Sequence, residues 1–457
     1  MSISVIPQGK ENVFIGKKPG SILARKGEKI LVLVPETGAW DIIDSTKASF
    51  LARLEQPVLW SSLVLGKEPY EVKGLEALVQ RLYHRGIVTL NGKGRSAGDH
   101  GIHRERQGFR WITIEFMKSG GAGSDHHILE KALAEKIIGA SLGAPCHKKL
   151  HLHIHIDDLG KCFDEFRAFM AVIEEKARAH QREVHSTLSL EKLFEERHRD
   201  YLKDHSGEVC CSLRGSPAQW ESALRFMGES RERGLTIVPR ALTKNREESM
   251  SALAALVCEG YGAVIISADT RPGSHCSPDD DFSLCSVEML RHAAQCGWEH
   301  RMPLVINELS HRVSRVVHRG APAGSSPHPC FSVPCACGIS ALSFDCEGNI
   351  YSCGLQNMGS SSPVFLGHID EVPDLSRFVE KNRVLAVLCS RNKELVPRCR
   401  RCEVRAFCGG GCARRTALAY DEVEREDPLC RTLKRFYEQV FWELDNNPLI
   451  EKILSNC

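Results

Sequence analysis

The residues best suited to chemistry are four cysteines in the segment PRCRRCEVRAFCGGGCARR. Cys399, Cys402, Cys408 and Cys412 follow a C-x2-C-x5-C-x3-C spacing. Thiolates held this close on tight turns suit an iron-sulfur cluster, and the glycines before the last cysteine let the backbone bend around it. Four cysteines would equally satisfy a structural zinc ion. The motif alone therefore leaves both metals open.

Other cysteines surround this motif. Cys330, Cys335 and Cys353 precede it, Cys430 follows it, and twelve of the twenty cysteines lie between Cys330 and Cys457. The first residues, MSISVIPQGKENVF, lack the basic and then apolar pattern of a secretion signal. We therefore expect a cytoplasmic protein, in which clustered cysteines favour metal ligation over disulfides.

With these cysteines, residues 328–457 resemble the SPASM domain that follows radical S-adenosylmethionine barrels. The family motif C-x9-15-G-x4-C is met by Cys335, Gly348 and Cys353, and Cys430 completes the pattern. The resemblance implies two [4Fe-4S] clusters with interleaved ligands: Cys330, Cys335, Cys353 and Cys412 for one, and Cys399, Cys402, Cys408 and Cys430 for the other. Cys337 lies near enough to Cys335 in the sequence to be an alternative ligand.

The elements that would carry this region begin upstream, in residues 108–310. Apolar runs alternate there with helical stretches, as in WITIEFM, HHILEKALAEKIIGASL and KLHLHIHI. Such repeats pair their strands in parallel, which predicts an α/β fold. The pattern fits either an open sheet or a partial (β/α) barrel, and the resemblance favours the radical SAM-type partial barrel.

The thiolates that would make this barrel a radical enzyme are missing from the expected place. The family needs C-x3-C-x2-C just after the first strand, and after WITIEFM that spacing falls on Ser119, Gly123 and His126. The Gly-Gly-Glu-Pro type end of the second strand is also missing, and Asp157 and Asp158 stand there instead. We therefore expect a degenerate barrel, and we do not expect it to cleave S-adenosylmethionine.

Three histidines alternate in LHLHIHI, so His151, His153 and His155 would share one face of a strand. Such a set on a barrel strand can hold zinc or iron, which would favour a hydrolase or an oxygenase. An ordinary strand with one wetter face shows the same pattern. Without further ligands we favour the second interpretation and keep the metal site as the alternative.

Residues 1–95 form a separate pattern of short strands, a turn at residues 36–38, and helices up to Tyr83. KILVLVPETGAWDIID and LVQRLYHRGIV resemble a PqqD-type element, a winged-helix-like α+β module that captures the leader of a ribosomal peptide by adding it to a sheet edge. The resemblance implies Trp40 and Ile42 at that edge, with Leu78 and Leu82 on the facing helix. These apolar residues would equally serve as the module's core.

Charge gives no support for nucleic-acid binding. The sequence has 60 Lys+Arg against 58 Asp+Glu, and residues 1–93 have 13 against 9, which is modest for phosphate contacts. We find no apolar run long enough to span a bilayer. We therefore expect neither a nucleic acid nor a membrane as partner, and rank peptide capture above DNA reading.

These patterns predict a protein in three parts: residues 1–95, 108–310 and 328–457. We expect it to bind a ribosomal precursor peptide and to act as partner or electron relay for an active radical SAM maturase. The alternative is that the chain is itself a radical SAM-like or metal-dependent peptide-modifying enzyme.

Overall fold

The computed structural model describes residues 13–36, 38–94, 109–118, 126–144, 146–205, 207–243, 245–261, 264–268, 287–300, 305–306, 313, 316, 341–352, 364–390, 396–447 and 450. Within them, no helix is both long and apolar enough to cross a membrane.

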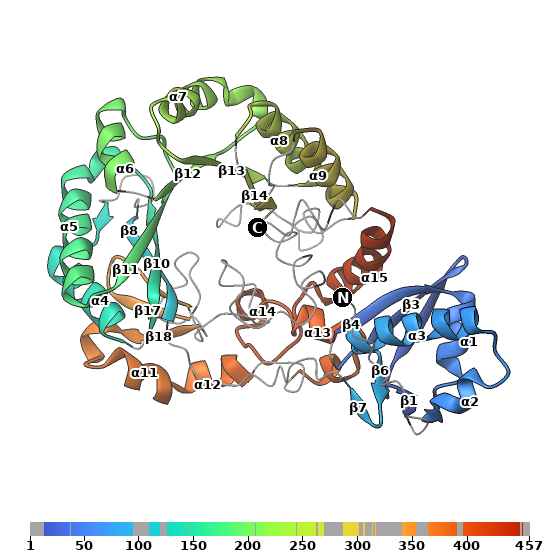
Figure 1. Ribbon diagram of the computed structural model, residues 1–457. Helices are drawn as coiled ribbons and strands as arrows, with labels where there is room; N and C mark the ends of the chain where they lie inside the picture. Colours follow the sequence, from blue (N-terminus) through green and yellow to red (C-terminus); the bar gives the residue numbers. More distant parts are fainter. Residues whose placement is uncertain are drawn as a thin grey trace.

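The N-terminal module, residues 13–94, holds two small antiparallel sheets and three helices (Figure 1). One sheet has the order β2-β3-β4 and the other β5-β1-β6-β7. The bounds are β1 (Phe14–Lys17), β2 (Ile22–Lys26), β3 (Lys29–Val34), β4 (Ala39–Asp44), α1 (Ser45–Ala52), β5 (Val58–Leu59), α2 (Trp60–Val64), α3 (Pro69–His84), β6 (Val88–Leu90) and β7 (Lys93–Gly94).

Local sequence signals explain these elements. Asp44 begins α1 by accepting a hydrogen bond from the Lys47 backbone N–H at 2.9 Å. Helix α3 starts with Pro69 and a reciprocal capping box between Glu68 and Glu71. The described part of this segment therefore has the strands and helices that the sequence predicts, in an α+β arrangement, whereas residue 37 of the predicted turn lies outside the described residues.

An arc of parallel strands follows, with helices between successive strands. Its strands are β8 (Phe109–Lys118), β10 (Cys146–Ile156), β11 (Glu183–Leu190), β12 (Glu208–Leu213), β13 (Ile237–Thr243), β14 (Ile265–Ala268) and β15 (Val305–Ile306). The intervening helices are α4 (Lys131–Gly143), α5 (Phe163–Ala179), α6 (Arg199–His205), α7 (Glu221–Glu232), α8 (Arg246–Cys258) and α9 (Val287–His300). Figure 1 shows these helices around the outside of the strands. The predicted α/β fold with parallel pairing is confirmed.

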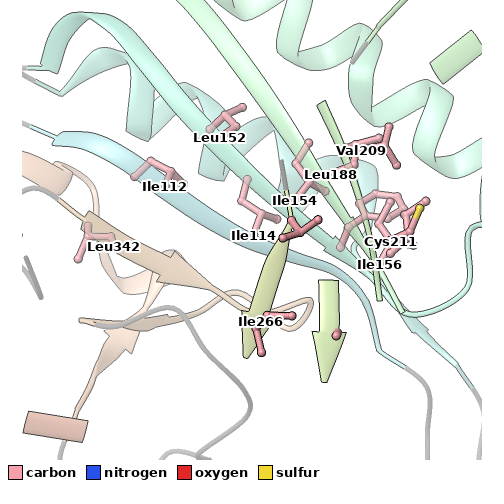
Figure 2. Close-up of a cluster of buried hydrophobic side chains, with 14 of the residues drawn as sticks. Ile112, Ile114, Leu152, Ile154, Ile156, Leu188, Val209, Cys211, Ile266 and Leu342 are labelled. Carbon is pink, nitrogen blue, oxygen red and sulfur yellow. The ribbon is translucent and has the colours of Figure 1, made fainter. Parts of the chain in front are cut away.

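The two faces of the arc differ in polarity. Ile112, Ile114, Leu152 and Ile154 are buried on the outer face, where they pack under the helices (Figure 2). Parallel register aligns Leu152 with Ile112 and Ile154 with Ile114, so the apolar residues form continuous rows. Burial of these rows fixes the register, because a shift by one residue would turn them inward.

The C-terminal region is joined directly to the arc. Strand β16 (Ala341–Phe344) pairs in parallel with β8, and β17 (Asn349–Tyr351) and β18 (Phe365–His368) continue the same sheet in antiparallel. The remaining described elements are the 3₁₀-helix η5 (Ile369–Glu371), α11 (Leu375–Lys381), α12 (Arg383–Ser390), the 3₁₀-helix η6 (Pro397–Arg401), α13 (Arg405–Cys408), α14 (Ala413–Tyr420) and α15 (Cys430–Asn446). The sheet is therefore mixed rather than purely parallel.

Candidate metal centre and the inner face of the arc

Four of the predicted ligands line one small cavity. Cys399, Cys402, Cys408 and Cys430 surround it, although Cys430 is distant from the others in the sequence. The rest of its wall is formed by Val404, Arg405, Gly410, Glu426, Asp427 and Lys434. We call this set of four cysteines the thiol cage.

Short helical turns and glycines bring the cage together. Cys399 lies in η6, Cys402 caps its end, and Cys408 is the last residue of α13. The three glycines that follow, Gly409, Gly410 and Gly411, have φ values of 64°, 92° and 78°. Only glycine adopts this left-handed backbone repeatedly without cost, so the GGG run turns the chain sharply after Cys408 and places Gly410 in the wall of the cavity.

Asp427 holds the turn after these glycines. Its carboxylate accepts hydrogen bonds from the Cys412 N–H at 2.6 Å, the Leu429 N–H at 3.0 Å and the Arg415 guanidinium at 2.8 Å. Burial alone would raise the pKa of Asp427, but Arg415 and these backbone donors outweigh it and lower the pKa below its usual value. The carboxylate thus ties the last cysteine of the motif to the start of α15.

The thiols of the cage are packed close enough to affect one another. Burial raises the pKa of the Cys402 thiol, and the neighbouring Cys408 adds to the effect. Burial and the nearby Cys408 and Cys402 raise the pKa of Cys430 to about 11. Without a cation beside them these two thiols therefore stay protonated at neutral pH, whereas a bound metal would favour their thiolates.

No three His, Cys, Asp or Glu side chains in the described part of the chain are placed to hold a single metal ion. In a polynuclear cluster each iron takes one thiolate, so the ligands surround a cavity instead of converging on one point. The donor set of the thiol cage fits such a cluster.

The other predicted cluster lies mostly outside the described residues. Cys330, Cys335 and Cys353, and the alternative ligand Cys337, belong to segments that the structure does not describe. Cys412 is described and is not among the residues that line the thiol cage. The ligand set of this cluster stays a prediction.

The histidine strand is β10, and its three histidines lie on the inner face of the arc. His151, His153 and His155 are all half-buried, while Leu152, Ile154 and Ile156 between them are buried. The neighbours in register of two of them are also polar: Thr113 and Thr187 flank His153, and Glu115 and Ser189 flank His155. The alternation that the sequence shows is therefore an inner polar face against an outer apolar one.

Several charged side chains lie close together at the carboxyl ends of these strands. The His155 Nε2 lies 3.5 Å from Asp157 Oδ1 and 3.9 Å from Glu191 Oε1. Glu191 also pairs with Arg214 and accepts a hydrogen bond from Ser212 at 3.2 Å. Burial raises the pKa of the nearby Glu115, against the effect of His155. Sequence reasoning selected His155 but missed Glu191 and Arg214, which no motif marks.

The place of the missing cysteine triad is only partly described. Ser119 and Gly123 lie outside the described residues, whereas His126 lies beside the Lys161 amine. Asp158 forms an ion pair with Lys192 at 2.9 Å, and Asp157 belongs to the charged group at the strand ends.

The four residues proposed for peptide contact are buried. Trp40 and Ile42 of β4 belong to the large core shared with the C-terminal helices, whereas Leu78 and Leu82 of α3 belong to the module's own core. Among the described strands β4 pairs only with β3. Its Ile42 N–H and carbonyl are engaged by Asp41 and Arg81, which pair with each other at 2.7 Å. A peptide-binding role for these residues stays a prediction.

Comparison with known proteins gives a likeness in fold. No protein family and no curated protein sequence matched the chain. A structure of native anSMEcpe with bound AdoMet aligns with a TM-score of 0.56 at 12% identity, over 74% of this chain and 98% of that one. The same protein with bound AdoMet and the Cp18Cys peptide aligns with a TM-score of 0.56 at 12% identity, over 76% of this chain and 99% of that one. Streptococcus suis SuiB bound to S-adenosylmethionine aligns with a TM-score of 0.50 at 12% identity, over 91% of this chain and 100% of that one. At these identities the likeness concerns the fold.

Proposed function

We propose that the chain is a SPASM-type iron-sulfur protein of a ribosomal peptide modification system. The observation that carries the proposal is the thiol cage, in which Cys430 joins three cysteines of a separate motif around one cavity. A cluster held there would supply single-electron transfer. The cage residues would hold it, and the wall around them would keep water away.

The start of helix α15 supports an anionic group in the cage. Cys430 is the first residue of α15, where the helix dipole favours negative charge. Thiolate-ligated iron-sulfur clusters carry net negative charge, so this helix start would stabilise one. The wall itself is balanced in charge, with Arg405 and Lys434 against Glu426 and Asp427.

We further propose that the chain acts as a partner or electron relay instead of cleaving S-adenosylmethionine itself. The sequence after β8 has no cysteine triad, and Asp157 and Asp158 replace the family's glycine-rich strand end. Neighbours of the same fold have been solved with AdoMet, and one of them with a peptide as well. That likeness supports a peptide as the ligand class and descent of residues 108–310 from an AdoMet-binding partial barrel.

In this proposal residues 1–95 form the PqqD-like peptide-recognition domain and residues 328–457 the SPASM domain with two [4Fe-4S] clusters. Strand β4 lies at the margin of its described sheet, and an extended peptide that adds a strand there would replace the contacts of Asp41 and Arg81 with the Ile42 backbone. The active radical SAM maturase would be a separate subunit.

Anaerobic reconstitution with iron, sulfide, reductant and S-adenosylmethionine tests the proposal. We expect an iron-sulfur spectrum and no 5'-deoxyadenosine from the isolated chain. Release of 5'-deoxyadenosine would refute the partner role, and zinc in place of iron would refute the cluster. Cys399→Ser is expected to lower the iron and sulfide content, and Cys258→Ser, an exposed thiol on α8, serves as its control.

A second candidate is a metal-dependent peptide-modifying enzyme, for which His155 is the candidate ligand; Asp157 and Glu191 lie 3.5 Å and 3.9 Å from its Nε2 as ion-pair partners, and the three are not placed around one ion. If this candidate holds, the purified protein carries a divalent ion that His155→Ala removes while the thiol cage keeps its iron. Unchanged metal content in His155→Ala would exclude it.

A further inference from the structure

The N-terminal module packs against the helices of the C-terminal region through aromatic side chains. The Trp40 ring of β4 lies 5.0 Å from the Phe441 ring of α15, and Phe441 lies 5.1 Å from Phe407 of α13. The Trp40 indole N–H donates to the Val316 carbonyl at 3.1 Å. We call Trp40, Phe407 and Phe441 the aromatic contact. All three are at least 95% buried, so the module is docked and not merely tethered.

The turn between β3 and β4 lies directly on α13. Gly38 in this turn has a φ of +69°. A Cβ atom at Gly38 would lie 3.1 Å from the Ala406 Cβ and 3.5 Å from the Phe407 ring. A side chain there would therefore both strain the backbone and push the module away from α13.

The docking surface and the thiol cage are built from the same two helices. Phe407 is followed directly by Cys408, and α15 carries Cys430 at its first residue and Phe441 further along. The Tyr437 hydroxyl of α15 donates to the Phe407 carbonyl at 3.2 Å, which fixes one helix on the other. The position of α13 relative to α15 therefore determines where the thiols of Cys408 and Cys430 lie. It also determines whether the Trp40 ring can pack against the aromatic residues of these helices.

Arg405 makes a second, polar connection. Its guanidinium pairs with Glu36 of the N-terminal module and donates to the Arg400 carbonyl at 2.7 Å. Arg400 lies between Cys399 and Cys402, and Arg405 itself lines the cage. The Arg405 side chain is only 13% exposed, so this one cation joins the module's turn to the loop that carries two cage thiols.

We propose that cluster ligation by the thiol cage and docking of the N-terminal module are linked, with Arg405 and the aromatic contact as positioning residues. The inference rests on the proposed function, because it takes the cage to hold a cluster. A cluster fixes α13 and the start of α15, and so favours the arrangement that Trp40 and Glu36 recognise. By reciprocity, whatever strengthens docking strengthens cluster binding, and iron release, which requires the cage to open, becomes slower. Peptide binding to the module would thereby change how tightly the thiol cage binds the cluster.

Hydrogen exchange on the full chain tests one direction of the linkage. We compare anaerobic protein before and after a chelator removes the iron. Exchange in residues 29–44, which contain β3 and β4, is expected to accelerate on the order of 10-fold, within the range common for linked sites. Exchange in β10, which has no part in docking, is expected to stay the same. Unchanged exchange in residues 29–44 would overturn the proposal.

Iron release to a chelator tests the other direction. Glu36→Gln, which removes the ion pair with Arg405, is expected to release iron several-fold faster than the parent protein. Glu36→Asp, which keeps the carboxylate, is expected to restore most of the parent rate. The matched control is Glu55→Gln, whose partner Lys17 belongs to the same module. Equal rates for Glu36→Gln and Glu55→Gln would contradict the role of Arg405.

Two tryptophan variants, one of them a control, test the aromatic contact. Trp40→Phe loses the hydrogen bond to Val316 and part of the ring contact, whereas Trp60→Phe changes a tryptophan that packs on the module's own core. Only Trp40→Phe is expected to speed iron release. Protein that never binds iron and sulfide would overturn the proposed function and the linkage together, whereas loaded protein that shows none of these changes would overturn the linkage alone.

Discussion

The strand arc and the thiol cage use cysteine in opposite ways. Cys210 and Cys211 lie within strand β12, where burial raises the pKa of Cys210 to about 11 and that of Cys211 further still. Cys402 and Cys430 instead line a shared cavity, at the end of η6 and the start of α15. A thiol buried within a strand serves as packing, whereas thiols grouped around a cavity are suited to metal ligation.

The two regions also differ in what holds them together. The outer face of the arc is a continuous apolar core under helices. The cage region consists of short helices and turns fixed by single polar residues such as Asp427. Burial of apolar surface therefore stabilises the arc, whereas the cage region relies on individual polar contacts.

The largest expected effect is on the cage. Cys402→Ser should abolish the cluster that Cys399, Cys408 and Cys430 share, because one of four iron ligands is lost. Iron and sulfide analysis of anaerobic protein measures this loss. Cys211→Ser, a buried thiol of the arc, should leave the iron content unchanged; equal losses in both variants would erase the distinction between the two regions.

Core truncation in the arc comes next. Ile154→Ala should lower the free energy of unfolding by about 2–5 kcal/mol, because Ile154 is fully buried on the outer face of β10. His153→Ala, the adjacent residue on the inner face, should cost less than about 1 kcal/mol. Urea unfolding monitored by circular dichroism compares the two. Similar costs would show that the inner face is as tightly packed as the outer one.

A smaller effect is expected from the glycine turn. Gly411→Ala places a Cβ against the Asp427 side chain at a φ of +78°, and should cost about 1–3 kcal/mol. Gly74→Ala, in helix α3 with open space around it, should instead stabilise by about 0.5–1 kcal/mol. Thermal unfolding separates these opposite signs, and a neutral Gly411→Ala would mean that the turn is adjustable.

The smallest effect concerns pH. His198 is fully buried and stacks on Phe163 with ring centroids 4.1 Å apart. Burial lowers its pKa, and Arg197 adds to this effect. The unfolded chain therefore binds a proton at His198 that the native protein excludes. Because of this difference, the free energy of unfolding decreases as pH falls below about 6.5. His198→Phe should flatten the pH dependence of unfolding in that range, and an unchanged slope would contradict it.

Local sequence pattern predicted the elements well, because period and polarity are local properties. The alternation in LHLHIHI gave both faces of β10, and the apolar runs gave the parallel strands around it. Pairing between distant segments could not be read in this way. Strand β16 is four residues long, and its sequence does not indicate that it pairs with β8. Likewise, Trp40 was recognisable as apolar, but its partner Phe441 was not.

The cage itself was partly predictable. The C-x2-C-x5-C spacing places three thiols close together through local turns, and the resemblance supplied Cys430. Its polar wall was not predictable, because Arg405 and Asp427 act through contacts with distant residues such as Glu36 and Cys412.

Metal and sulfide analysis of the full chain, purified without oxygen, tests the central claim most directly. The thiol cage predicts iron and acid-labile sulfide in equal amounts, with both reduced in Cys430→Ser. Zinc without sulfide, or iron content that Cys430→Ser leaves unchanged, would contradict it.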